Sequence, residues 1–331
     1  MPPVPTMPPV PAIPARPTGE ATARAVAFVA ARRQDAEQLG RDLAEQVQDP
    51  DAVVWDLQAA FARLADPDYL AGQQFVAPGI GALIGVRWPL HAAVARGFRQ
   101  ATRQDPSSTL LFVAERLLRE EELELRWFAF GILERTLVGE PERTWQLLRG
   151  AAREVGDWIT VDALAHPYGR GILLEPHRWA ELEQLAFSSS RWERRLVGST
   201  LATIPHVDRR SGRTPQIVDR ALPLLAQLIG DDQPDVQKSL GWAYRTMAQL
   251  DPQRTLAAIA IEAERAANTH DGHRTWVIRD TLPKLPPAHA DRLRARLAGI
   301  RKRPGEPSSS VAAAAAARFR ANERSLGDAD L

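Results

Sequence analysis

In the middle of this chain, indole side chains recur one helical turn away from an acid or a base. Trp158 lies four residues before Asp162, and Trp192 lies three residues before Arg195. Residues three or four apart share one face of a helix. Indole planes beside a carboxylate and a guanidinium can form a cleft for a sugar, a base or a phosphate.

A third pair of the same kind follows further along the chain. Trp242 precedes Arg245 by three residues, and Lys238 lies one turn before Trp242 on the same helix face. Taken alone, each pair is better explained by packing, because tryptophan at helical spacing usually belongs to a core. Three pairs in successive units favour one shared surface, because equivalent positions of a repeat protein line up.

Other kinds of chemistry lack their motifs. The chain has no cysteine, which excludes disulfides, iron–sulfur clusters and thiolate zinc sites. Its seven histidines are scattered without the spacing of metal ligands, and neither HExxH nor GxSxG occurs. We therefore expect no metal and no cofactor, and either a metal-free acid–base site or no catalysis.

The elements that position these residues are predicted to be helices. Apolar residues recur every three or four positions, as between Leu110 and Leu137, and the sequences Asp66-Pro67 and Asp251-Pro252 mark helix boundaries. No run alternates with period two between hairpin turns. The fold class is therefore predicted to be all-α.

The helical segments also resemble one another. Four of them share a large residue, a basic or polar neighbour and then a small residue; they begin at Leu125, Arg191, Val236 and Arg274. Their spacing fits a period of roughly 33 to 43 residues with two helices each, which describes a HEAT-like solenoid. Stacked helix pairs curve, so the prediction includes a concave face where a partner would bind.

The two ends of the chain differ from this pattern. Residues 1–18 contain eight prolines and predict a disordered arm, residues 19–302 form the repeat domain, and residues 303–331 are expected to be a flexible, alanine-rich tail. No apolar run approaches the ~20 residues of a membrane span. We expect a monomer in the cytoplasm, associated with the nucleoid.

The charge distribution gives a mild indication of the partner. The net charge is only +1, yet residues 188–303 carry 20 Lys and Arg against 12 Asp and Glu. Such asymmetry favours a polyanion on the basic part. The alternative is a solvated repeat surface on which charges happen to cluster.

The motifs WITVD, WERR and QKSLGWAYR, in this order and spacing, resemble the AlkD-like DNA alkylation repair family. Members are HEAT-like glycosylases that remove cationic purines such as 3-methyladenine and 7-methylguanine. The resemblance covers roughly residues 60–285, and QK-x-x-GW-x-x-R is its most specific part. It implies hydrolysis of the N-glycosidic bond of alkylated purines, bulkier adducts included, in duplex DNA.

The resemblance also implies roles for single residues. Trp158 and Trp242 would be aromatic walls against the sugar of the damaged nucleotide, Asp162 the catalytic carboxylate, and Arg195 a grip on the backbone phosphate. Further DNA contacts would come from nearby cations of these motifs and of the early segment GVRWPLHAAVARGF, namely Arg87, Arg96, Arg194, Lys238 and Arg245.

The sequence departs from the family near its early helix, which can carry a tyrosine close to the lesion. This chain has Phe75 or Val76 there, and Tyr69 lies several residues too early. Two other functions remain open, namely a non-catalytic DNA-binding relative and a protein-interaction scaffold. The enzyme hypothesis requires Asp162, Arg195 and the two tryptophans to converge on the concave side, open to solvent.

Overall fold

The computed structural model describes residues 19–315 and residue 318, and this part of the chain folds into helices without any strand. Its α-helices are α1 (Gly19–Ala44), α2 (Pro50–Leu64), α3 (Pro67–Val76), α4 (Trp88–Ala101), α5 (Ser107–Leu118), α6 (Leu123–Thr136), α7 (Pro141–Glu154), α8 (Trp158–Leu174), α9 (Trp179–Leu185), α10 (Arg191–Val207), α11 (Pro215–Leu228), α12 (Pro234–Leu250), α13 (Pro252–Thr269), α14 (Gly272–Thr281) and α15 (Pro287–Arg296), and residues 311–315 are also helical. Three 3₁₀ helices interrupt them, η1 (Thr102–Gln104), η2 (Pro176–Arg178) and η3 (Leu282–Lys284). The predicted all-α class is confirmed.

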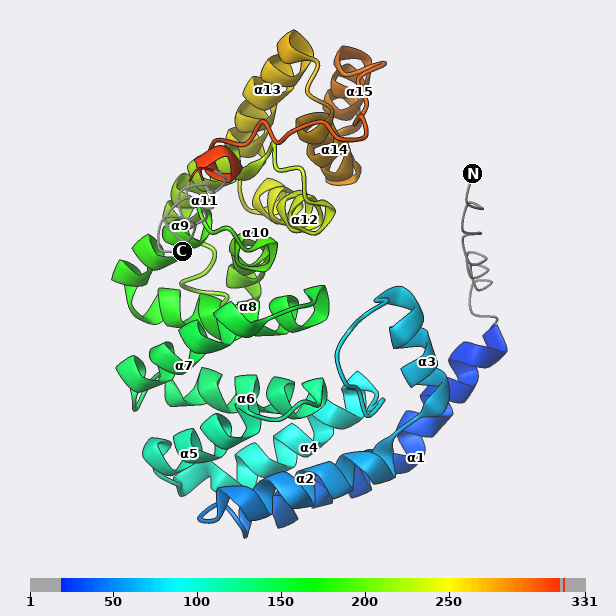
Figure 1. Ribbon diagram of the computed structural model, residues 1–331, viewed down its shortest axis with the longest axis vertical. Coiled ribbons are helices and arrows are strands. Elements are labelled where there is room, and N and C mark those ends of the chain that lie inside the picture. The colour runs from blue at the N-terminus through cyan, green and yellow to red at the C-terminus, as the bar shows by residue number, and fades with distance from the viewer. Residues whose placement is uncertain (1–18, 316–317, 319–331) are drawn as a thin grey trace, which may run out of the picture.

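The helices are arranged as a curved solenoid of two layers (Figure 1). In the inner layer α6, α8, α10, α12 and α14 pack side by side in chain order, and α7, α9, α11 and α13 cover their outer side. At the N-terminal end α1 lies along α4, and α3 stands apart on the inner side. The predicted helical-repeat architecture is therefore confirmed.

Several helices begin at the predicted Asp-Pro sequences. Asp66 and Asp251 are N-caps whose carboxylates accept hydrogen bonds from backbone N–H groups of α3 and α13. Proline then occupies the first turn, where its missing N–H costs no hydrogen bond. Asp157 caps α8 in the same way by accepting from the N–H of Thr160 at 2.8 Å. This cap fixes where the helix that carries Asp162 starts.

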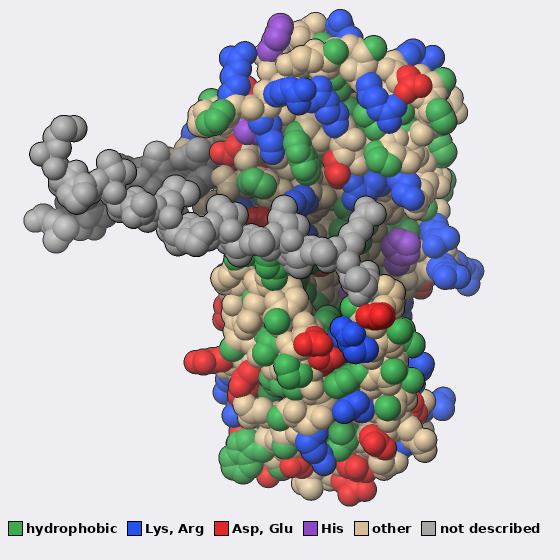
Figure 2. All heavy atoms as spheres, turned by 90° about the vertical axis from the view of Figure 1, so that its right-hand side faces the viewer, with side chains coloured by type: hydrophobic (Ala, Val, Ile, Leu, Met, Phe, Trp, Pro, Cys, Tyr) green, Lys and Arg blue, Asp and Glu red, His purple; other side chains and the backbone are tan. Residues whose placement is uncertain are grey.

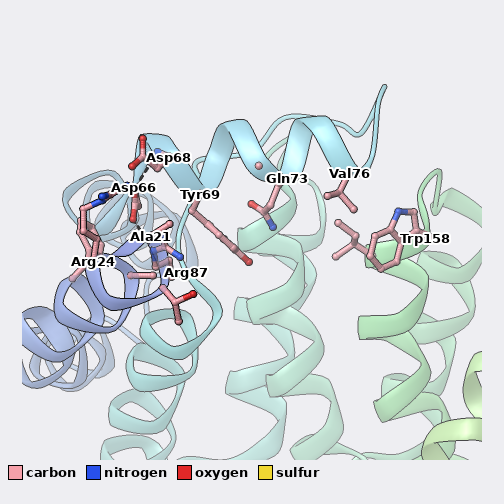
Figure 3. Close-up of a pocket in the computed structure, with 14 residues that line it drawn as sticks. Ala21, Arg24, Asp66, Asp68, Tyr69, Gln73, Val76, Arg87 and Trp158 are labelled. Carbon is pink, nitrogen blue, oxygen red and sulfur yellow. Dashed lines mark hydrogen bonds and ion pairs between the residues drawn. The ribbon is translucent and has the colours of Figure 1, made fainter. Parts of the chain in front are cut away.

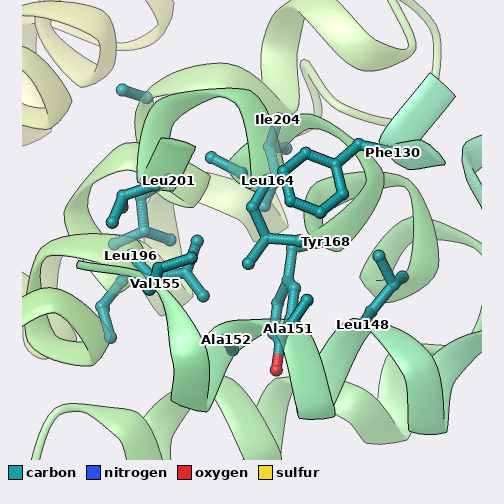
Figure 4. Close-up of a cluster of buried hydrophobic side chains, with 14 of the residues drawn as sticks. Phe130, Leu148, Ala151, Ala152, Val155, Leu164, Tyr168, Leu196, Leu201 and Ile204 are labelled. Carbon is teal, nitrogen blue, oxygen red and sulfur yellow. The ribbon is translucent and has the colours of Figure 1, made fainter. Parts of the chain in front are cut away.

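The core lies between the two layers of helices (Figure 4). Around α8, the almost fully buried Tyr168 packs with Phe130 of α6, Leu148 of α7 and Ile204 of α10. Burying an apolar side chain of this size stabilises the fold by about 1.5–3 kcal/mol. Packing against the outer helices therefore holds the inner helices in place, and the opposite, inner faces of these helices remain available for a functional site.

The described part of the predicted tail is packed and not loose. Ser310 is almost fully buried, Ala312 is fully buried, and the N–H groups of Ser309 and Ser310 donate to the carbonyl of Gly230. The repeat domain therefore extends past the predicted boundary at residue 302. The proline-rich arm (residues 1–18) and residues 316–317 and 319–331 of the tail lie outside the described residues. Of the described helices, none is long and apolar enough to cross a membrane.

Candidate active site

Asp162 lies in the second turn of α8 and points at α10. Its two carboxylate oxygens accept hydrogen bonds from Nη2 of Arg195 at 3.1 and 2.8 Å, and Ser199 Oγ donates to Oδ1 at 2.6 Å. About a quarter of the side chain remains accessible, with an exposed fraction of 23%. The carboxylate is thus fixed in orientation by α10 and still reaches solvent.

Arg195 is the buried partner of this pair, with only 5% of its side chain exposed. Nη1 donates to the carbonyl of Asp235 at the start of α12 at 2.7 Å, and Cζ lies 5.8 Å from the ring centroid of Trp158. The guanidinium therefore links three inner helices. Nη1 and Nη2 of Arg195 are thus engaged by Asp235 and Asp162, and the predicted contact of Arg195 with a backbone phosphate stays a prediction.

The three tryptophans take different positions. Trp158, the first residue of α8, is half-buried beside Arg195, and its role as an aromatic wall stays a prediction. Trp242 lies two inner helices further, in the third turn of α12, and is partly buried against the core. Trp192 also packs on the core, and the Arg191 guanidinium covers its ring at 4.5 Å.

Arg194 was predicted to contact DNA, but the structure buries its side chain. Its side chain is 2% exposed, its Nε bonds Oδ2 of the fully buried Asp231 at 2.7 Å, and its Nη1 donates to the carbonyl of Ser188 at 2.9 Å. No surface of its guanidinium is left for a phosphate. Arg194 ties α10 to the loop before α12 and has a structural role.

The two other predicted cations of α12 lie at the surface. Lys238 is exposed, in the second turn of the helix. Arg245 is half-buried and pairs with Asp280 of α14, donating through Nη1 both to its carboxylate and, at 2.9 Å, to its carbonyl oxygen. Arg245 is therefore partly neutralised, whereas Lys238 is available to an anion.

Arg87 and Arg96 belong to the N-terminal end of the solenoid. Arg87 precedes α4, and its Nε bonds Oδ2 of Asp66 at 2.6 Å. Burial opposes the charge of Asp66, but the hydrogen bond and the charge of Arg87 prevail and hold the pKa of Asp66 below its usual value. Arg96 faces α1, where Nη1 lies 3.6 Å from Glu37. Neither cation contacts the Asp162 pair.

A cavity of about 810 Å³ separates α1 and α3 from the N-terminus of α8 (Figure 3). Its lining combines aromatic and aliphatic side chains with an internally paired Asp–Arg couple; it includes Phe28, Asp66, Tyr69, Gln73, Val76, Arg87 and Trp158. Trp158 and Val76 face each other across it (Figure 3). The cavity is suited to a flat, largely apolar group beside Trp158.

Tyr69 corrects the expectation that no tyrosine would lie close to this site. It lines the same cavity as Trp158, and burial raises the pKa of its phenol, so it stays a neutral hydrogen-bond donor. Residues 69, 73 and 76 share one face of α3, so helical spacing counted from the Asp66 cap could have located Tyr69.

His166 was also missed by the sequence analysis. It lies one turn after Asp162 on α8, and its Nδ1 is 2.9 Å from Oε2 of Glu134 on α6. This hydrogen bond to the carboxylate raises the pKa of His166 above its ordinary value. The sequence could have indicated this position, because His166 follows Asp162 by four residues and therefore shares its helix face. His166 adds a titratable cation to the inner face.

Among the described residues, Glu142, Glu175 and His177 form one cluster of possible metal ligands. Their ligand atoms lie within 4.8 Å of one another. The fully buried Arg178 already pairs with both carboxylates, at 3.5 and 2.7 Å. Its positive charge competes with a cation. The cluster is explained as an ion-pair network around η2.

Fold and site together define a helical-repeat protein that presents a fixed carboxylate beside an indole. The family model described as DNA alkylation repair enzyme matches residues 57–272. This match covers more than half of the 331 residues, so the chain belongs to that family of DNA repair enzymes, and the resemblance of the motifs is confirmed. A comparison with curated proteins gives no significant match. Helix α1 and the chain after Gly272, the first residue of α14, lie outside the matched residues.

Proposed function

We propose that this protein is a DNA glycosylase that hydrolyses the N-glycosidic bond of cationic alkylated purines in duplex DNA. The observation that carries the proposal is the partly exposed Asp162 carboxylate, fixed by Arg195 and Ser199. It lies one turn from Trp158 in a chain of the DNA alkylation repair family. The substrates would be 3-methyladenine, 7-methylguanine or bulkier adducts.

The chemistry follows from the charge of such a base. A purine alkylated on a ring nitrogen is positive and leaves as a neutral molecule, so the enzyme need not protonate it. Positive charge then develops on the sugar, where the negative charge of Asp162 stabilises it. The carboxylate also orients a water molecule whose oxygen bonds to C1′ while its proton passes to Asp162. The products are a free purine and an abasic sugar.

The residues around Asp162 prepare it for this role. Arg195 and Ser199 hold the carboxylate before substrate arrives, so little reorganisation is needed during the reaction. The Trp158 indole adds cation–π attraction for the developing charge, on the order of 0.5–2 kcal/mol. Trp242 is proposed as the second aromatic wall. The cavity beside Trp158 provides room for a larger substituent on the base.

The test is an incubation of duplex DNA containing 7-methylguanine with excess protein, followed by separation of free purine. Wild type should release the base. Asp162→Asn should lower the single-turnover rate by about 100-fold or more, the usual effect of removing a group that stabilises transition-state charge. Its affinity for DNA should stay within a few-fold of wild type.

The matched control is Asp219→Asn, which removes a carboxylate on the outer helix α11 that pairs with Arg254 of α13. It should keep the wild-type rate. An Asp162→Asn protein with full activity would contradict the assignment. A wild type that binds duplex DNA but releases no base would indicate a non-catalytic relative, and weak, salt-insensitive binding would indicate a protein scaffold.

A further inference from the structure

After α15 the chain turns back and crosses the end of the solenoid. This segment, residues 301–315, is called the strap here; drawn in orange and red in Figure 1, it passes over α14 and α12 toward α11. Lys302 Nζ donates to Oε1 of Gln237 on α12 at 2.7 Å, and Nε2 of His273 on α14 bonds the carbonyl of Glu306 at 2.9 Å. Polar contacts therefore fasten the strap to the inner helices.

Two glycines allow the strap to come this close. A Cβ on Gly272, at the start of α14, would lie 2.4 Å from the carbonyl oxygen of Arg301 and 2.5 Å from the nitrogen of Lys302. A Cβ on Gly230 would lie 2.8 Å from the nitrogen of Ser310. These contacts are with backbone, which cannot move aside cheaply. The position of the strap is thus specified by the fold.

The strap brings a run of cations to the start of α12. Arg301 and Arg303 are exposed, and Lys302 lies with Nζ 4.7 Å from the ring centroid of Trp276. Burial and the neighbouring charge of Lys238 lower the pKa of Lys302. Within the described part of the chain, the side chains of these four cations form no ion pair. The one acid of the strap, Glu306, accepts a hydrogen bond from the backbone N–H of Arg303 at 3.1 Å, so the strap carries three cations against one carboxylate.

These cations contrast with three arginines of α10 and α12 in the inner layer. Arg194, Arg195 and Arg245 each pair with an aspartate. Figure 2 shows the inner side of the molecule, where Lys and Arg gather over the C-terminal part. An unpaired basic surface of this kind is the electrostatic footprint of a bound polyanion.

The basic surface adjoins the candidate active site. Arg195 bonds both Asp162 and the carbonyl of Asp235, and Gln237, half a turn further along α12, bonds Lys302. A continuous series of contacts therefore leads from the carboxylate to the strap. A duplex whose lesion lay at Asp162 would extend along the inner face toward these cations.

We propose that Arg301, Lys302 and Arg303 of the strap, together with Lys238, bind the phosphate backbone of the duplex beyond the lesion. The inference rests on the proposed function for the position of the lesion. It assigns a DNA contact to a segment outside residues 57–272, which match the family model. Phosphate contacts of this kind position a duplex and carry no sequence information.

The experiment measures affinity of the full chain for an unmodified duplex by fluorescence anisotropy over a range of salt concentration. Each phosphate contact contributes about 0.9 to the slope of log affinity against log salt. The double variant Arg301→Ala/Arg303→Ala should therefore reduce that slope by about two. Gly272→Ala, which displaces the strap without removing a charge, should also weaken binding.

The control is Arg220→Ala/Arg254→Ala, which removes the same charge from the outer helices α11 and α13, where both arginines pair with acids. Its slope should match wild type. If the strap double variant and Gly272→Ala both bind like wild type while remaining folded by circular dichroism, the inference is overturned. Base release by wild type, measured in parallel on duplex containing 7-methylguanine, separates the two proposals. If the strap variants weaken DNA binding but wild type releases no base, the proposed function alone is contradicted. If wild type releases the base but the strap variants bind DNA like wild type, this inference alone is contradicted.

Discussion

The two ends of the solenoid differ in whether their charged side chains form ion pairs. At the N-terminal end, the cavity is aromatic, and its Asp66–Arg87 couple is internally neutralised. At the C-terminal end, the strap and Lys238 present four cations whose side chains form no ion pair with any residue that the structure describes. One end suits a flat ring and the other an anionic backbone. Asp162 lies between them on α8.

The same contrast exists within one helix. Arg194 and Arg195 are neighbours on α10, and each pairs with one aspartate. The Arg194–Asp231 pair is fully enclosed, whereas the Arg195–Asp162 pair opens to solvent through its carboxylate. An enclosed pair can only stabilise the fold. A pair that opens on one side can also meet a substrate.

The largest effect on stability is expected at the enclosed pair. Arg194→Ala would leave Asp231 buried without its partner, which typically costs ~3–5 kcal/mol. Urea unfolding should show this loss, and Arg220→Ala on the outer surface should change the free energy of unfolding by less than about 1 kcal/mol. Equal effects from both variants would mean that Arg194 is not the enclosed structural residue described above.

Acid should weaken the N-terminal end through His91 of α4. Its ring is buried against Trp88, and burial lowers the pKa of His91 to about 4, from an ordinary value of 6.5. The unfolded chain binds the proton first, so this stability is complete above pH 6.5 and falls as the pH drops toward 4. The loss should approach about 3 kcal/mol. Urea unfolding at several pH values measures it, and His91→Gln should remove this part of the pH dependence.

The aromatic side of the site is tested at Tyr69. Tyr69→Ala removes a ring from the cavity wall, and stacking on such a ring is worth about 1–3 kcal/mol. We therefore expect base release at limiting enzyme to fall about tenfold or more, and Tyr69→Phe to fall less. A Tyr69→Ala rate equal to wild type would remove the cavity from the proposed site.

The smallest effect concerns His166. Because Glu134 raises the pKa of His166, the ring remains protonated somewhat above pH 6.5 and loses its charge as the pH rises further. DNA affinity should decline over that range by a few-fold, since one surface charge interaction is worth up to about 1 kcal/mol. Titration of the duplex with His166→Gln should show a flatter pH profile than with wild type.

The sequence predicts the architecture well, because periodicity and Asp-Pro caps are local signals. It also predicts the meeting of Asp162 with Arg195, since repeat register places equivalent turns of α8 and α10 together. The roles of Arg194 and Arg195 were harder to separate. They are adjacent in sequence, and only Asp231, 37 residues away from Arg194, decides which one is enclosed.

Two further features escaped prediction for a different reason. The strap is rich in Pro, Gly and Ser, a composition typical of loose chain, and it is held by backbone hydrogen bonds to Gly230 that leave no periodic pattern. Helical spacing from the Asp66 cap places Tyr69 on one face of α3 with Gln73 and Val76, but no local signal places that face on the same cavity as Trp158, which is far away in the sequence.

The most direct measurement compares, in one experiment, the two aspartates that pair with the neighbouring arginines of α10. Asp162→Asn and Asp231→Asn would each be assayed for the free energy of unfolding and for single-turnover release of 7-methylguanine at saturating protein. We expect Asp162→Asn to be slow but stable, and Asp231→Asn to be destabilised while its folded fraction retains the wild-type rate. Equal rates for both variants would contradict a chemical role for the exposed carboxylate.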